Sequence, residues 1–235
     1  MAVPSIVGAI VPLPMTVAGN TTAAFTRLAG EAPLVRVLRT ILGAVAEPAA
    51  VVVATAKPLL GDVRESLAAH GLSTAVAVAA DPGARAQCLT AGLDYFEREQ
   101  ISPQHVIVHD VRRPLASADL FGRVVAALRK GGPVVMPALP LTDSVKSVDE
   151  HGSVTGSLDR SLLQVVQYPR GFATDQLARL LAQRSSDEFD ELEEVIAAGA
   201  PITVVDGDSS AFVAELPRDA AFVEAIIAHR PAGDS

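Results

Sequence analysis

The sequence predicts an α/β protein built on a doubly wound, mostly parallel sheet. Short apolar segments rich in β-branched residues alternate with segments of helical periodicity as far as residue 138, the pattern of a parallel sheet with crossover helices. The short segments are apolar at successive positions, as in strands that are buried on both faces. The 235 residues are 49% hydrophobic, which provides enough core for one large domain or two small ones.

Hydrophobic periodicity and the intervening Pro and Gly residues set the boundaries of the expected elements. The expected strands are residues 5–11, 50–54, 74–79, 106–108, 134–138, 165–168, 202–205 and 212–215. The expected helices are residues 33–45, 59–70, 84–96, 118–130, 174–184, 188–198 and 217–229, and residues 12–22 are expected to form a loop. Residues 144–148 and 154–158 flank a Glu-His-Gly turn, so we expect an inserted hairpin that serves dimer contact or closes a site.

Composition argues against several classes of function. The formal net charge of −8 argues against a nucleic-acid backbone as the main partner, because such binding needs clustered basic side chains. No apolar run has the length of a membrane span, and no Lys or Arg precedes the first apolar stretch as in a signal peptide. The single cysteine, Cys88, excludes an internal disulfide and a multi-cysteine zinc site. We therefore expect a cytoplasmic protein without a membrane or nucleic-acid partner.

Residues 106–114, VIVHDVRRP, form the strongest candidate for a functional site. The apolar run ends in His109 and Asp110, and Arg112 and Arg113 follow. Ligands of open α/β sheets bind outside the carboxyl ends of the strands, where a carboxylate beside arginines can hold a metal ion or a phosphorylated ligand. The alternative is that Asp110 caps a loop and the arginines are solvated. His109 is expected to pack at the strand end rather than to catalyse.

Several short blocks share their order and spacing with the motifs of one enzyme family. Residues 85–88 (RAQC) are similar to RADS, 109–114 (HDVRRP) to HDAARP, 142–146 (TDSVK) to TDTIK, 158–161 to LDRS, and 167–172 (QYPRGF) to QTPQGF. Residues 187–188 and 205–208 stand where the family has TDEA and VEGD. Through these blocks nearly the whole chain, residues 6–228, resembles the 2-C-methyl-D-erythritol 4-phosphate cytidylyltransferase (IspD) family.

The resemblance implies a single Rossmann-like nucleotidyltransferase domain over residues 1–235, with a protruding β-arm over residues 139–164 that forms a homodimer. It implies the reaction of CTP with 2-C-methyl-D-erythritol 4-phosphate, which gives CDP-methylerythritol and diphosphate in isoprenoid biosynthesis. It further implies that Asp110 ligates Mg²⁺ and takes part in catalysis. The nucleotide-binding residues would be Pro12, Leu13, Gly19, Arg85, Cys88, Asp110 and Arg113. The residues near the acceptor would be Thr142, Asp143, Arg160 and Lys146, the last counted with the catalytic residues.

The departures from the family fall on the catalytic parts. The family follows its first strand with a Gly-rich loop, PAAGxGxRM, and then PKQ, whereas residues 12–24 read PLPMTVAGNTTAA. Only Gly19 supplies glycine freedom there, and Pro14 lacks an N–H donor. The PKQ lysine aligns with Ala24, and the second catalytic lysine aligns with Val213. The three lysines of the chain lie in other expected elements, which leaves Arg27 as the candidate substitute.

Two hypotheses therefore stay open. In the first, the protein is a cytidylyltransferase that works through a substitute loop and Arg27. In the second, it is a non-catalytic paralogue that acts as a ligand-binding or dimeric interaction module. Backbone N–H groups of residues 13–20 around a cavity beside Asp110 would favour the enzyme, and a cavity filled by Leu13, Met15 or Val17 would not. The acidic residues 187–191 are expected in the first turn of a helix, where carboxylates suit the helix dipole.

Overall fold

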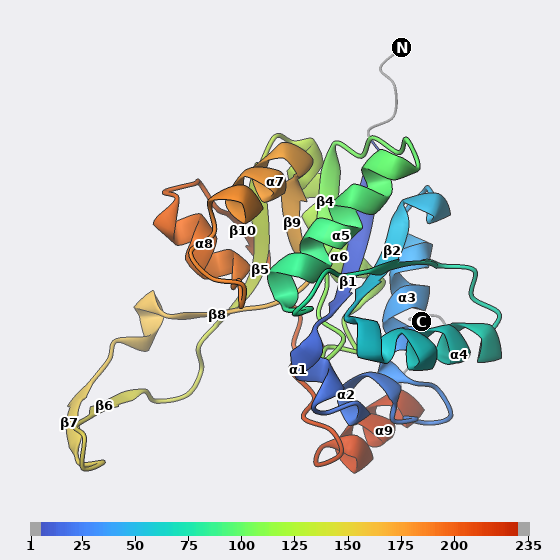
Figure 1. Cartoon of the computed structure of the whole chain (residues 1–235). Coiled ribbons are helices and arrows are strands. Elements are labelled where there is room, and N and C mark those ends of the chain that lie inside the picture. Colours follow the sequence, from blue (N-terminus) through green and yellow to red (C-terminus); the bar gives the residue numbers. More distant parts are fainter. Residues whose placement is uncertain (1–5, 230–235) are drawn as a thin grey trace.

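The computed structural model describes residues 6–229, which form a mixed sheet with helices on both faces (Figure 1). The sheet order is β10-β5-β9-β4-β1-β2-β3, and β8 pairs with β5. Its strands are β1 (Val7–Leu13), β2 (Val51–Thr55), β3 (Ala75–Val78), β4 (His105–Val108), β5 (Val134–Pro140), β8 (Gln164–Val166), β9 (Arg170–Ala173) and β10 (Thr203–Asp206). The helices are α1 (Met15–Ala18), α2 (Thr22–Phe25), α3 (Pro33–Ala44), α4 (Leu60–Ala69), α5 (Arg85–Arg98), α6 (Ala118–Arg129), α7 (Thr174–Gln183), α8 (Glu191–Ala197) and α9 (Ala220–His229).

Strand β1 is an interior strand of the sheet and separates two apolar clusters. It pairs in parallel with β2 and β4, and all seven of its residues are buried. Ala9, Val11 and Leu13 face the cluster that includes residues of α3 and α6, whereas Ile10 faces the cluster that includes residues of α5 and α7. This alternation of faces confirms the predicted α/β sheet with flanking helices.

Helix α5 lies unusually close to β1 because a glycine faces the strand. A Cβ built on Gly92 would lie 2.7–2.9 Å from three side-chain atoms of Ile10. A side chain at this position would push the helix away from the strand. The same packing fixes the position of Arg85, the first residue of α5.

The predicted strand set needs two corrections, one strand that was missed and one that does not form. Strand β9 was not predicted, although it lies antiparallel between β4 and β5 in the middle of the sheet. It contains Arg170 and Gly171, which are poor strand signals, and a Cβ on Gly171 would lie 2.7 Å from side chains of α6. The strand expected over residues 212–215 is wrong: this segment is irregular, and the Ala214 N–H donates to the Arg112 carbonyl over 2.8 Å. The loop expected over residues 12–22 contains the last residues of β1, α1 and the start of α2.

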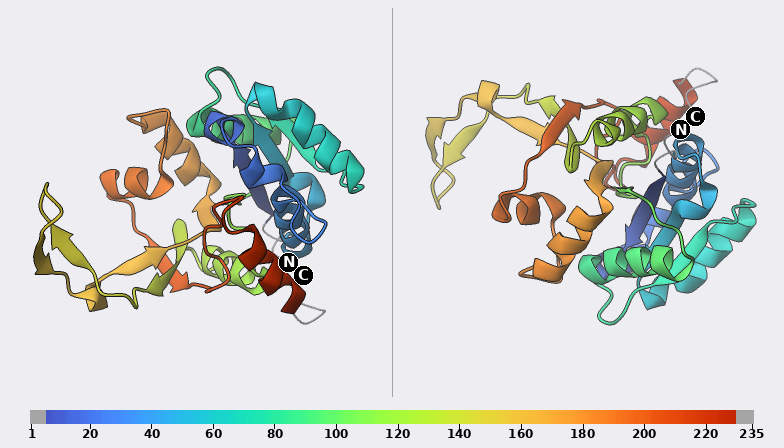
Figure 2. Two further views of the ribbon diagram at one scale, coloured as in Figure 1. Left: turned by 90° about the horizontal axis from the view of Figure 1, so that it is seen from below. Right: turned by 90° about the horizontal axis from the view of Figure 1, so that it is seen from above.

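The predicted hairpin projects from the body of the protein. Strands β6 (Lys146–Val148) and β7 (Val154–Ser157) pair with each other and belong to a separate two-stranded sheet. Figures 1 and 2 show this arm extending away from the main sheet in all three views. Its exposed large apolar side chains are Val148, Val154, Leu158 and Leu162. Within residues 6–229, no helix combines the length and apolar character that crossing a bilayer requires.

Candidate active site

A cavity of about 600 Å³ opens beside Asp110, at the carboxyl ends of β1 and β4. It lies between the segment that follows β1, the turn that precedes α5, and the loop that follows β4. Its lining residues are Pro12, Pro14, Met15, Thr16, Val17, Asn20, Ala23, Pro82, Ala84, Arg85, Asp110, Arg112 and Glu188. The lining therefore combines mostly apolar residues with two arginines and two acidic residues. The position agrees with the rule for ligand sites in open α/β sheets.

Asp110 is held by its near neighbour Arg112. The Arg112 side chain donates from Nη2 to Asp110 Oδ2 over 2.6 Å and from Nε to both carboxylate oxygens over 3.1 Å. The Arg112 backbone N–H also donates to Oδ1 over 2.9 Å. Burial by itself raises a carboxyl pKa, but the hydrogen bonds and charge of Arg112 lower the pKa of Asp110 to about 2. Asp110 is therefore ionised throughout the neutral range. It accepts from the loop N–H of Arg112, as a cap would, but the arginines are not simply solvated: Arg112 pairs with Asp110, and Arg113 is buried.

Arg85 reaches the pocket from the first turn of α5 and is fixed from behind by a buried ion-pair cluster. Glu191, which is fully buried, accepts from Arg85 Nη2 over 2.6 Å and from Arg170 Nη1 over 2.7 Å. The Tyr168 hydroxyl donates to Glu191 Oε2 over 2.6 Å and accepts from Arg85 Nη2 over 3.1 Å. Burial by itself lowers the pKa of Arg85, but the charges of Glu191, Tyr168 and Asp110 together with the Glu191 hydrogen bond raise that pKa, so Arg85 stays cationic.

This cluster corrects the expectation for the acidic run at residues 187–191. Helix α8 begins only at Glu191, and Asp190 is its N-cap, accepting from the N–H groups of Leu192 and Glu193. Glu191 does lie in the first turn, but its side chain points into the core and binds two arginines instead of facing solvent. The preceding loop also contacts α5 directly, because the Asp187 carbonyl accepts from the Ala86 N–H over 3.1 Å.

The segment after β1 forms short helical turns and does not present a row of free donors. The N–H groups of Met15, Val17, Gly19 and Asn20 donate to the carbonyls of Gly83, Pro14, Met15 and Val17, in that order. Gly19 has φ −72° and ψ −19°, an ordinary right-handed conformation that makes no use of glycine freedom. Met15 and Val17 line the cavity without filling it. The pocket is thus open, but these four N–H groups are already bonded.

Gly83 joins this segment to the turn before α5. Its φ of +74° favours glycine, and a Cβ there would lie 2.9 Å from the Ala56 Cβ and 3.3 Å from the Met15 Cγ. Its carbonyl accepts from the Met15 N–H over 2.8 Å. Gly83 therefore holds the turn before α5 against the segment that follows β1, and both border the pocket.

The structure brings three of the predicted nucleotide-binding residues to the pocket and leaves four elsewhere. Pro12, Arg85 and Asp110 belong to its lining, whereas Leu13, Gly19, Cys88 and Arg113 do not. The four others are placed as follows: Leu13 is in the core, Gly19 ends α1, Cys88 is a buried free thiol, and Arg113 is buried with Nη1 donating to the Ala211 carbonyl.

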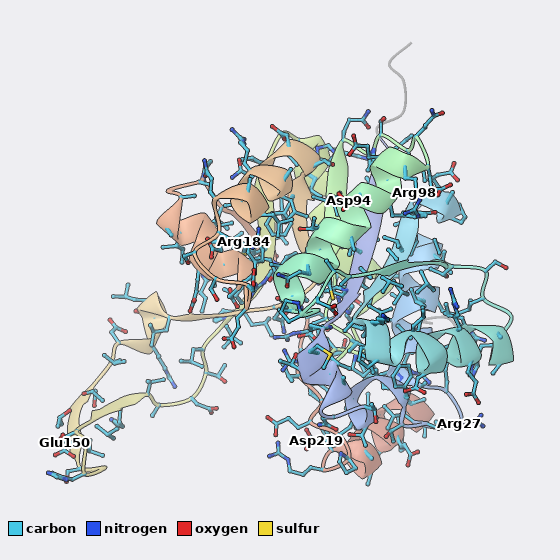
Figure 3. The ribbon with its side chains drawn as sticks, in the orientation of Figure 1. Arg27, Asp94, Arg98, Glu150, Arg184 and Asp219 are labelled. Carbon is cyan, nitrogen blue, oxygen red and sulfur yellow. The ribbon has the colours of Figure 1, made fainter. Side chains whose placement is uncertain are left out.

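The other predicted residues also lie outside this pocket. Arg27 lines a second cavity, of about 270 Å³, with residues of α4, and Figure 3 shows it well away from α5. Thr142, Asp143, Lys146 and Arg160 lie on the arm, whose far end is marked by Glu150 in Figure 3. On the arm, Lys146 Nζ donates to Ser157 Oγ over 2.6 Å, and the Arg160 guanidinium donates to the Thr142 carbonyl.

The sequence placed Arg112 beside Asp110 but gave it no separate role, and it assigned no site role to Glu188, which lines the pocket, or to Glu191, Tyr168 and Arg170, which lie behind Arg85. Two signals were available. Arg112 stands where the HDAARP motif has alanine, and Tyr168 and Arg170 stand where QTPQGF has threonine and glutamine. No such signal marked Glu191, because its burial depends on how α8 packs against the sheet.

Asp110 suits a divalent cation in charge and position, but its carboxylate oxygens are occupied by Arg112. Mg²⁺ is commonly held by one or two carboxylates together with substrate phosphates. Among residues 6–229 there is no group of three or more His, Cys, Asp or Glu side chains placed to hold a metal ion. A cation at Asp110 would therefore take further ligands from phosphate and water, and it would have to displace the Arg112 side chain.

The sheet order and the pocket define an α/β protein of the nucleotidyltransferase fold. In solved structures the same fold occurs in 2-C-methyl-D-erythritol 4-phosphate cytidylyltransferase from Thermus thermophilus (TM-score 0.69, 25% identity, 94% of this chain and 98% of that one). The 4-diphosphocytidyl-2C-methyl-D-erythritol synthase from Anaerococcus prevotii shows the fold at 19% identity (TM-score 0.78, 95% and 96%).

Sequence comparison identifies the family within this fold. Residues 16–229 match the family described as IspD, 2-C-methyl-D-erythritol 4-phosphate cytidylyltransferase. The enzyme of that name from Streptomyces coelicolor is 33% identical over 221 residues, which cover 90% of this chain and 80% of the relative. The one from Rhodococcus opacus is 34% identical over 210 residues, 88% of each chain. The protein belongs to the 2-C-methyl-D-erythritol 4-phosphate cytidylyltransferase family, as the motif resemblance predicted.

Proposed function

We propose that this protein transfers CMP from CTP to 2-C-methyl-D-erythritol 4-phosphate in the pocket beside Asp110. A phosphate oxygen of the acceptor attacks the α-phosphorus of CTP, and the bond from that phosphorus to the β-bridging oxygen breaks, releasing diphosphate. The observation that carries the proposal is the family match over residues 16–229 together with an open cavity that presents Asp110, Arg85 and Arg112.

Among the residues that the structure describes, Arg85 and Arg112 are the positively charged side chains that line the pocket. We assign them the task of holding the triphosphate, because a guanidinium binds phosphate oxygens in a bidentate manner and keeps its charge. The buried Glu191 keeps Arg85 at the pocket wall, so this charge is in place before the ligand arrives. Nucleotidyl transfer depends largely on such positioning and charge stabilisation. Arg27 is not given this role, because it lines a different cavity.

Nucleotidyltransferases of this family typically use a divalent metal, and we propose that Mg²⁺ binds at Asp110 together with the phosphates. When bound, the cation would neutralise charge on the phosphates. Asp110 offers an ionised carboxylate for this purpose, with its orientation held by the Arg112 backbone N–H.

The acceptor would be held by the arm of a second copy of this chain. Thr142, Asp143, Lys146 and Arg160 lie on the arm and do not line the pocket of their own chain, so we assign them to the pocket of a second copy. The arm also exposes apolar side chains, among them Leu162 at 81% and Val154 at 66%. Exposed apolar surface of this kind marks an interface. We therefore propose a homodimer whose arms complete the partner's sites.

The alternative of a non-catalytic paralogue rests on the replaced lysines and the bonded N–H groups. The cavity is open, and Met15 and Val17 border it without blocking it. The family reaction is therefore the better-supported function.

A pyrophosphate-release assay with CTP, methylerythritol phosphate and Mg²⁺ tests the proposal. The wild type is expected to release diphosphate only when both substrates are present. Asp110→Asn is expected to reduce the rate on the order of 10²–10³-fold. Arg98, labelled in Figure 3, is the last residue of α5, whereas Arg85 is the first, so Arg98→Ala serves as a matched control and should leave the rate unchanged. No release by the wild type above the protein-free rate would refute the proposed activity.

The dimer is tested separately by sedimentation velocity. Leu162→Glu places a charge on the most exposed apolar side chain of the arm and should shift the protein from dimer to monomer. A wild type that sediments as a monomer at micromolar concentration would contradict the proposed assembly.

A further inference from the structure

We propose that the Arg112 side chain is a latch on the metal-binding carboxylate: it competes with a divalent cation for Asp110 and leaves when an anionic ligand draws it away. The inference deepens the proposed function, because the cation would serve the same pocket. It concerns access to Asp110, however, and can be tested without any turnover.

The first support is that the Arg112 side chain occupies both carboxylate oxygens of Asp110. Its guanidinium contacts both carboxylate oxygens, with Nη2 at 2.6 Å from Oδ2 and Nε at 3.1 Å from each oxygen. A metal ion binds a carboxylate through the same lone pairs that these N–H groups occupy. The cation and the guanidinium therefore exclude each other.

The second support is that the latch is able to move while its target stays in place. The Arg112 side chain is 54% exposed, whereas that of Asp110 is 7% exposed. The Arg112 backbone N–H holds Oδ1 at 2.9 Å independently of the guanidinium. When the side chain turns away, the carboxylate keeps one hydrogen bond and its orientation, and it presents a free oxygen to the cavity.

The third support is the position of Arg112 in the pocket lining. It lies in the same cavity as Arg85, so a phosphate group bound by Arg85 comes within reach of the Arg112 guanidinium. Transfer of Arg112 from Asp110 to a phosphate exchanges one charge-assisted pair for another, which keeps the cost of opening low. The expected order is therefore anionic ligand first and divalent cation second.

Titration of Mn²⁺ alone, followed by electron paramagnetic resonance of the free ion, tests the latch in the full-length protein. The variants are the wild type, Arg112→Ala, Asp110→Asn and the double variant, which form a double-mutant cycle. Arg112→Ala is expected to bind Mn²⁺ about tenfold more tightly than the wild type, because it uncovers an oriented carboxylate. In the Asp110→Asn background, the same substitution should change the affinity little.

Arg98→Ala is the matched control, since Arg98 also pairs with a carboxylate nearby in sequence, Glu99, over 3.1 Å. A similar gain of Mn²⁺ affinity in this control would show a general effect of lost positive charge and would overturn the proposal. Equal Mn²⁺ affinity in the wild type and Arg112→Ala, or a gain that persists with Asn at position 110, would also overturn it.

A second titration with CTP present separates the latch from the proposed function. If both hold, then after subtraction of the Mn²⁺ that CTP binds without protein, CTP should raise the Mn²⁺ affinity of the wild type more than that of Arg112→Ala, whose carboxylate is already free. A Mn²⁺ affinity that CTP leaves unchanged in every variant would refute CTP as the ligand, while the comparison without nucleotide still decides whether Arg112 covers a metal position.

Discussion

Glu191 and Arg85 are 106 positions apart in the chain, yet Glu191 Oε1 lies 2.6 Å from Arg85 Nη2 and 2.8 Å from its Nε. The carboxylate is fully buried, and Arg85 borders the pocket. Helix α8 therefore fixes a cation of the proposed nucleotide site without contacting the ligand position itself. Two arginines share this carboxylate, since Arg170 binds its other oxygen.

Glu191→Gln should reduce both stability and nucleotide binding. The substitution leaves Arg85 without its carboxylate partner and Arg170 with only its 3.3 Å pair to Asp190, and breaking a buried pair from one side costs about 3 kcal/mol. Urea unfolding followed by circular dichroism measures the stability, and calorimetric titration measures CTP affinity. Glu193→Gln, an exposed residue of the same helix, is the control. Equal stability of Glu191→Gln and the control would contradict the buried cluster.

Gly92→Ala should destabilise the protein by about 1–3 kcal/mol, because the new methyl group would overlap the Ile10 side chain. Gly122→Ala is a matched control in α6, where a Cβ meets no atom within 4 Å. That change should stabilise the protein by up to about 1 kcal/mol through helix propensity. The two urea midpoints should therefore move in opposite directions, and a shift in the same direction would be evidence against the close packing of α5 on β1.

His109 should make stability fall as the pH drops below 6.5. Burial lowers the pKa of His109 from 6.5 to about 4 in the folded state, so between these values the unfolded chain binds a proton that the folded protein does not. This difference favours unfolding and should cost about 2 kcal/mol between pH 7 and pH 5. The contribution of Asp110, whose pKa is lowered to about 2, is lost only in more acidic solution.

Urea unfolding at a series of pH values measures the slope of the unfolding free energy against pH. His109→Gln should flatten most of it. His105→Gln should keep most of it, because His105 is only partly buried although its pKa is also lowered. A slope that His109→Gln leaves unchanged would show that other groups cause the pH dependence.

Cys88 should resist thiol reagents in the folded protein. The thiol is buried, and burial raises the pKa of Cys88 to about 12, so almost no thiolate exists at neutral pH. Labelling with a disulfide reagent at pH 8 should proceed at the rate of unfolding and become fast in denaturant. Rapid labelling of the native protein would instead place Cys88 at an accessible surface.

Sequence periodicity was sufficient for most strands of the sheet, the longer helices and the hairpin, because strands buried on both faces and amphipathic helices leave local patterns. Strand β9 was missed for a local reason, since Arg170 and Gly171 lack β-propensity and are placed by long-range contacts. The irregular path of residues 212–215 has the same origin: an apolar segment is held by single hydrogen bonds to other loops and not by a strand ladder.

The site was predictable where it depends on strand ends. Asp110 follows a buried strand, and its place at the pocket follows from that alone. The covering of Asp110 by Arg112 and the support of Arg85 by Glu191 depend on side-chain rotamers and helix packing, which no spacing rule encodes. The placement of Arg27 in a separate cavity depends on the turns of α1 and α2, where only a loop was expected.

Phosphorus magnetic resonance of CTP, methylerythritol phosphate and Mg²⁺ incubated with the protein tests the central claim most directly, because it observes both products. The account predicts that resonances of a diphosphate diester and of free diphosphate grow together, and that Asp110→Asn suppresses both. Unchanged spectra of CTP and methylerythritol phosphate after prolonged incubation with the wild type would contradict the assignment of cytidylyl transfer to this pocket.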